Sequence, residues 1–149
     1  MDLPGQIATA KVNLKTKPFY DRIDFHPIDL LNTSLKIPKG ADAVWMSQFL
    51  DCFYETEIIA ILENVHQAVD IDTPVYILET FVDNQKFEAA KYSLTATSLY
   101  FTTMANGNSK MYRLNHMREL VHKAQFEIIE EYPLIGNSYH TILKCKKRK

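Results

Sequence analysis

Apolar residues recur with helical spacing in four stretches of this chain, and each stretch predicts an α-helix. The first is "DLPGQIATAKVNLK" (2–15), whose opening acid and proline place Pro4 in the first helical turn. The second covers 57–69, with Thr56 as a suitable N-cap, and the third is the long aromatic-rich segment 87–104. The fourth stretch carries apolar residues at helical spacing, namely Leu114, Met117, Leu120, Val121 and Ala124.

Short apolar runs between these helices predict strands. "ADAVWMSQFL" (41–50) and "VYILETFV" (75–82) are continuous enough to predict strands buried on both faces, and "RIDFHPIDLL" (22–31) predicts a short strand and a turn. "FEIIEEYPLI" (126–135) and "YHTILKC" (139–145) follow each other without a helix and should pair antiparallel. This order predicts an α/β three-layer sandwich whose sheet is mostly parallel, with an antiparallel C-terminal strand.

Length and charge narrow the class of protein. A chain of 149 residues is long enough for one domain with a real core, and a net charge of −1 argues against duplex DNA as a partner. No apolar run approaches the roughly 18 residues of a membrane span, and "MDLPGQIATA" lacks the build of a signal peptide. Cys52 and Cys145 show no metal or redox spacing. We therefore expect a soluble, cytoplasmic protein without a membrane partner.

Four segments of the chain resemble a known family. "DLP", "GADAVWMSQFLDCFYETEIIAILENVHQAV", "VYILETFV" and "MYRLNHMRELVHKAQFEIIEEY" are collinear with the C-terminal portion of S-adenosylmethionine-dependent O-methyltransferases. The closest resemblance is to the plant small-molecule and the bacterial polyketide and hydroxyneurosporene types. No single motif is diagnostic, but the collinear set covers nearly the whole chain.

The resemblance implies a Rossmann-like methyltransferase domain in which some family features have no counterpart. Family members carry a helical dimerisation domain and a first strand that ends in a glycine-rich loop, whereas this sequence has 4 glycines and no G-x-G. We expect residues 1–149 to be a partial catalytic domain that lacks the first strand and most of the second. We further expect weak S-adenosylmethionine binding by this chain alone, low stability from an exposed strand edge, and a homodimer for a full-length version.

The resemblance also implies cofactor contacts. Asp2 and Leu3 match the end of the family's second strand, whose acid binds the ribose hydroxyls, although Asp2 would also suit a helix N-cap. Asp29 and Leu30 match a turn around the adenine, although an Asx turn after Pro27 explains Asp29 equally well. The end of the next strand would place three more residues beside the cofactor: Met46, Ser47 and Gln48.

Asp51 stands where the family carries its histidine base. An ordinary aspartate, with a pKa near about 4, is a weak base unless burial raises the pKa. Glu79 matches one of two carboxylates that orient the histidine, so the two acids could form a carboxyl pair, and Met111 falls at the second carboxylate position. The alternative for both acids is a polar strand end without a chemical role.

Aromatic residues between 87 and 112 would form a wall for the acceptor, a hydroxyl of an aromatic or polyketide-like small molecule. The resemblance places four residues at the acceptor: Phe53, Tyr92, Met104 and Met111. Ordinary helix packing is the alternative for each of them, and the histidines form no metal-ligand pair. Two other functions stay open, a non-catalytic methyltransferase remnant that acts as a binding or partner module, and a different nucleotide-binding module. The missing phosphate loop counts against the latter.

Overall fold

The structure is a computed structural model that describes residues 1–32, 34–105, 107–137 and 139–148. The chain separates into two compact units, residues 1–36 and residues 37–149.

Unit 1–36 contains the predicted first helix. Helix α1 spans Pro4–Leu14, with proline in its first turn and Ile7 buried. The strand predicted at 22–31 is wrong, because this stretch forms only an isolated parallel bridge between Asp2 and Pro27. Proline has no N–H for a ladder, and residue 2 is followed at once by the start of α1, so the pairing cannot extend.

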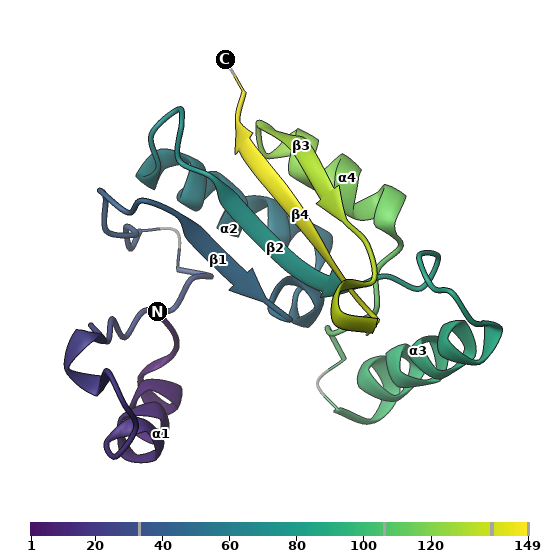
Figure 1. Cartoon of the computed structure of the whole chain (residues 1–149), viewed down its shortest axis with the longest axis horizontal. Helices are drawn as coiled ribbons and strands as arrows, with labels where there is room; N and C mark the ends of the chain where they lie inside the picture. The colour runs from purple at the N-terminus through teal and green to yellow at the C-terminus, as the bar shows by residue number, and fades with distance from the viewer. Residues whose placement is uncertain (33, 106, 138, 149) are drawn as a thin grey trace. The chain divides into compact units, whose positions relative to one another are not determined.

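Unit 37–149 is built on a four-stranded sheet with the order β1-β2-β4-β3. Its strands are β1 (Val44–Ser47), β2 (Val75–Thr80), β3 (Phe126–Tyr132) and β4 (His140–Lys147). β1 pairs parallel with β2, and β4 pairs antiparallel with both β2 and β3. Three strands therefore run in one direction and the C-terminal strand runs against them (Figure 1), which confirms the predicted sheet.

Two helices cover one face of this sheet. α2 (Glu55–Ala68) and α4 (Leu114–Lys123) contact each other and lie on the same side of the strands (Figure 1). α2 begins earlier than predicted, and Thr56 is not its N-cap. The N-cap is Tyr54, whose backbone N–H donates to Glu57 Oε2 at 2.8 Å, so the Glu57 side chain caps the first turn of the helix.

The opposite face of the sheet is open within this unit. Along β2, Val75, Ile77 and Glu79 are buried, whereas the residues between them are partly exposed. Trp45 on β1 is 55% exposed and its ring lies 5.7 Å from that of Tyr76. The prediction that both strands are buried on two faces is therefore wrong. The unbroken apolar run arose because the open face also carries aromatic and aliphatic side chains.

The predicted aromatic helix is also present. α3 spans Glu88–Tyr100 and continues as a π-helical turn, η3 (Phe101–Ala105). Ala90 is the one buried residue of α3, and most of its large side chains face solvent.

Candidate functional site

The predicted catalytic residues lie where β1 and β2 end, at the edge of the sheet where the β4 strand begins. Asp51 belongs to a single 3₁₀ turn, η2 (Leu50–Cys52), that follows β1, and Glu79 is the penultimate residue of β2. Parallel strands bring their carboxyl ends to one edge of a sheet, which is why two acids far apart in the sequence meet there.

Glu79 is a buried carboxyl group with one satisfied oxygen. It is 1% exposed, and its Oε1 accepts the backbone N–H groups of Phe49 at 2.9 Å and Leu50 at 2.8 Å. Its Oε2 is buried with no hydrogen-bond partner among the described residues. Burial, helped by the negative charge of Asp51, raises the pKa of Glu79 to about 8. Glu79 is therefore mainly neutral at pH 7.

Asp51 is half-buried beside Glu79. Burial raises the pKa of its carboxyl above the ordinary value, which makes Asp51 a stronger base than a solvated aspartate. The Cys52 thiol lies 3.6 Å from Asp51 Oδ1, and burial and Asp51 raise the thiol pKa to about 11, so the thiol keeps its proton. The structure thus brings the two predicted acids to the same strand ends, where burial raises both pKa values and the charge of Asp51 adds to the shift of Glu79.

Hydrogen bonds from segment 107–113 fix the position of the turn that carries Asp51. The backbone N–H of Lys110 donates to the carbonyl of Asp51 at 2.9 Å, and the Tyr112 hydroxyl donates to the carbonyl of Phe53 at 2.7 Å. Sequence reasoning missed both contacts. The available signal was the position of Tyr112 beside Met111, which had been aligned with the site.

Met111 and Phe53 also lie at this edge. Met111 Sδ accepts the Thr80 hydroxyl at 3.2 Å, and its backbone N–H donates to Ser98 Oγ at 3.1 Å. The ring of Phe53 packs edge-on against Phe49 at 4.9 Å. The position of the family's second carboxylate is thus occupied by a thioether, which cannot accept a proton at neutral pH.

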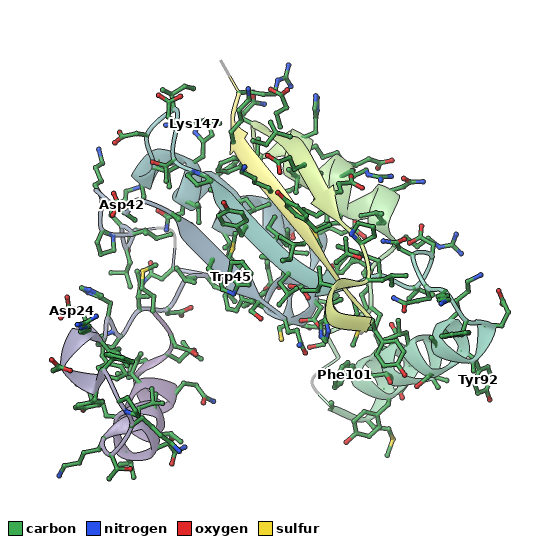
Figure 2. All side chains as sticks on the ribbon, viewed as in Figure 1. Asp24, Asp42, Trp45, Tyr92, Phe101 and Lys147 are labelled. Carbon is green, nitrogen blue, oxygen red and sulfur yellow. The ribbon has the colours of Figure 1, made fainter. Side chains whose placement is uncertain are left out.

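The predicted contacts Tyr92 and Met104 are exposed, by 79% and 75%. Ser98 makes the contact between α3 and Met111, so the C-terminal half of α3 is the part joined to the site. Tyr92 lies in the first half of α3, whereas Phe101 directly follows its C-terminal end (Figure 2). Both acceptor contacts therefore stay predictions.

The predicted cofactor residues at the end of β1 include one, Gln48, whose backbone is left-handed. Met46 is buried under the helices, whereas Ser47 and Gln48 are exposed. Gln48 adopts a left-handed conformation with φ of 46°, and its N–H donates to Leu78 O at 2.8 Å. Its amide nitrogen lies 2.7 Å from Nε2 of His140. This turn directs the chain from β1 towards Asp51.

The remaining cofactor positions lie in unit 1–36. Asp2 Oδ1 accepts the N–H of Leu3 at 2.8 Å, and Asp29 Oδ1 accepts the N–H of Leu31 at 3.0 Å, so the Asx turn is present. Both acids are exposed, and Leu30 is half-buried beside Asp29 in the sequence. A second oxygen on each carboxylate can accept a hydrogen bond from a ribose diol or an exocyclic amine. These two acceptors suit the donor groups of a nucleoside.

Within the described residues, no group of three or more His, Cys, Asp or Glu side chains could hold a metal ion. None of the helices in this part of the chain is long and apolar enough to cross a membrane. Both cysteines are free thiols.

Comparison with known families and structures gives a consistent result. The profile of the O-methyltransferase domain family matches residues 1–127. No match is found among curated proteins.

Many solved structures share this fold. The mitomycin 7-O-methyltransferase MmcR is 17% identical with a TM-score of 0.81, over 97% of this chain and 40% of its own. An O-methyltransferase family protein from Burkholderia thailandensis is 19% identical, with a TM-score of 0.77 over 99% of this chain and 42% of its own. A family 2 protein from Planctomyces limnophilus, solved with apigenin, is 14% identical, with a TM-score of 0.78 over 98% and 41%. This chain spans about two fifths of each.

Proposed function

Because this chain belongs to the O-methyltransferase domain family, we propose that it serves S-adenosylmethionine-dependent methyl transfer to a hydroxyl of an aromatic or polyketide-like small molecule. The observation that supports this proposal is the carboxyl pair of Asp51 and Glu79 at the ends of β1 and β2. In this proposal Asp51 is the general base and Glu79 is its partner.

The chain's own residues would handle the proton. S-adenosylmethionine supplies the methyl group when it is bound. The Asp51 carboxylate would accept the proton of the acceptor hydroxyl as that oxygen takes the methyl group. The net reaction would give a methyl ether, S-adenosylhomocysteine and a proton held on the two carboxyl groups. Neutral Glu79 avoids a second negative charge beside Asp51, because two adjacent carboxylates do not ionise together readily.

The weakness of a carboxylate base favours an aromatic hydroxyl as the acceptor. Each pKa unit between acceptor and base costs about 1.4 kcal/mol of proton transfer. A phenol, with a pKa near about 10, is therefore easier to ionise by about 8 kcal/mol than a hydroxyl group whose pKa resembles that of water, about 15.7. An acidic acceptor thus compensates for the absence of histidine.

Five residues would contact the cofactor, three in unit 1–36 and two in unit 37–149. Asp2 and Asp29 offer exposed carboxylates for the ribose and the adenine amine, and Leu30 offers an apolar surface for the ring. Ser47 and Gln48 follow β1 and would add polar contacts on the side that leads to Asp51.

The test is Asp51→Asn, which keeps the size of the side chain and removes the base. We expect methyl transfer to a panel of phenols, measured as S-adenosylhomocysteine released, to fall at least about tenfold. Asp42→Asn, an exposed acid before β1, is the matched control and should leave the rate unchanged. Equal rates for Asp51→Asn and the parent would remove Asp51 from the mechanism.

A non-catalytic binding module is the second candidate. Two differences from the family favour this candidate. Asp51 stands where the family carries its histidine base, and Met111 stands where the family carries its second carboxylate. Calorimetric titration with S-adenosylhomocysteine separates the two candidates. Binding of S-adenosylhomocysteine together with turnover supports the enzyme. The absence of both binding and turnover supports the non-catalytic module.

Location, oligomeric state and partner are also part of the proposed function. We propose a cytoplasmic location, supported by the free thiols of Cys52 and Cys145, and a homodimer in a full-length version. The proposed partner is a small-molecule acceptor, with no nucleic acid or membrane partner.

A further inference from the structure

We propose that Tyr112 is a positioning residue whose hydroxyl group holds the turn that carries Asp51 against β2, so that the Asp51 and Glu79 carboxyl groups stay paired. The catalytic meaning of this inference rests on the proposed function. The contacts themselves do not.

The turn that carries Asp51 is too short to hold its own position. η2 is one 3₁₀ turn of three residues, and the carbonyl groups at the end of such a turn need partners outside it. On its amino-terminal side, Glu79 Oε1 accepts the N–H groups of Phe49 and Leu50. On its carboxyl side, the Asp51 and Phe53 carbonyls accept from segment 107–113. The turn is thus held between two anchors.

Tyr112 joins both carboxyl-bearing elements through one residue. Its backbone carbonyl accepts the N–H of Val82 at 3.1 Å, three positions after Glu79. Its hydroxyl donates to the Phe53 carbonyl at 2.7 Å, two positions after Asp51. The length of one tyrosine therefore sets the spacing between the end of β2 and the Asp51 turn.

The Tyr112 hydroxyl is a permanent donor. The residue is 2% exposed, and burial together with nearby carboxylates raises the pKa of the phenol well above its ordinary value, so it keeps its proton. The ring is held from two sides, by Lys110 Nζ at 4.7 Å from its centroid and by His116 with 5.5 Å between ring centroids. Lys110 Nζ is in turn 3.0 Å from Glu55 Oε1 on α2. Such a fixed ring aims the hydroxyl at one acceptor.

Removing the Tyr112 hydroxyl group should separate the Asp51 and Glu79 carboxyl groups without disturbing the packing of the core. A Phe53 carbonyl without its donor would turn towards water, and the Asp51 turn would follow it. Water would then enter beside Glu79, and the burial that raises its pKa would diminish. The titration of Glu79 therefore reports the position of Asp51 without any need for turnover.

The experiment is a carboxyl-carbon NMR titration of Tyr112→Phe, which keeps the aromatic ring. The Glu79 signal is assigned by its loss in Glu79→Gln. We expect the Glu79 midpoint to fall from about 8 by at least about half a unit. Tyr100→Phe, an exposed tyrosine at the end of α3, is the matched control and should leave the midpoint in place. An unchanged midpoint in folded Tyr112→Phe would overturn the proposal.

A second variant guards against a folding defect in Tyr112→Phe. The Tyr54 hydroxyl donates to Gly107 O at 3.1 Å and links the same two segments from an exposed position. Tyr54→Phe should lower the Glu79 midpoint in the same direction by a smaller amount. If Tyr112→Phe does not fold and Tyr54→Phe leaves the midpoint unchanged, the proposal fails.

Turnover provides a separate measurement. Where the parent methylates a phenol, Tyr112→Phe should lower kcat about tenfold and leave KM within about twofold, because the hydroxyl group acts on the base and not on acceptor binding. A parent that shows no methyl transfer would contradict the proposed function, while the NMR titration would still decide the role of Tyr112.

Discussion

At the scale of single residues, Glu79 shows how burial changes a carboxyl group. Two backbone N–H groups bond to Oε1 and favour the ionised form, yet the full burial of the side chain outweighs them and raises its pKa. Glu79 Oε2 is buried without a hydrogen-bond partner among the described residues, which destabilises the folded state. Such a group is retained more readily for chemistry than for stability, since a neutral amide would satisfy the same donors.

This balance predicts the effect of Glu79→Gln on stability. The folded chain keeps the Glu79 proton up to about pH 8, whereas the unfolded chain loses it near 4.5. The folded state therefore binds more protons between these values, and its free energy of unfolding falls as pH rises through that window. Glutamine cannot ionise, so the variant should match the parent near pH 5 and exceed it by at least about 2 kcal/mol at pH 8.

Urea denaturation at the two pH values measures this difference. Glu119→Gln, an exposed acid on α4, is the control and should follow the pH slope of the parent. If Glu79→Gln shows the same slope as the parent, the folded pKa of Glu79 is close to its ordinary value.

At the scale of elements, the end of β1 carries local strain. Gln48 has a φ of 46°, a left-handed conformation that costs a side-chain-bearing residue about 1–2 kcal/mol. The Gln48–His140 contact is exposed and offsets only part of that cost. Strain at this position turns the chain out of the strand and towards Asp51.

Gln48→Gly should therefore stabilise the fold, by about 0.5–1 kcal/mol, because glycine adopts this conformation freely. Thermal unfolding measures the gain. Ser47→Gly, in the strand immediately before, is the control and should destabilise, since glycine weakens a strand. A loss of stability in Gln48→Gly would mean that the side-chain contact with His140 matters more than the strain.

At the scale of the whole molecule, the sheet of unit 37–149 has one covered and one open face. Trp45, Tyr76 and Leu78 lie on the open face, together with Ile142, which is paired with Leu78 in the sheet register. Exposed apolar side chains on a sheet favour association. The low stability expected from the sequence stays a prediction.

We expect this face to mediate concentration-dependent self-association of the chain, and Trp45→Lys should weaken it. Removing the largest apolar side chain of this face is expected to raise the dissociation constant at least about tenfold, measured by sedimentation equilibrium. Ile71→Lys, a similarly exposed apolar position before β2, is the control and should have little effect. Equal association of the parent and Trp45→Lys would show that this face does not mediate the contact.

The amino-acid pattern by itself determined most elements of the fold and the strand ends at which Asp51 and Glu79 lie. Helical spacing predicted α1, α2 and α4, a long aromatic-rich segment predicted α3, and the two apolar runs located β1 and β2, because burial leaves its pattern in the sequence. The same pattern could not distinguish an open sheet face from a covered one. It also predicted a strand at 22–31, since propensity does not reveal whether a neighbour is available for pairing.

Only the tertiary structure decided how Asp51 is held. The contacts of Lys110 and Tyr112 with its turn join residues about 60 positions apart through backbone carbonyls, which carry no sequence signature. The pKa of Glu79 likewise depends on its burial and on the proximity of Asp51. The sequence placed two acids at strand ends, and packing buried both of them and raised their pKa values.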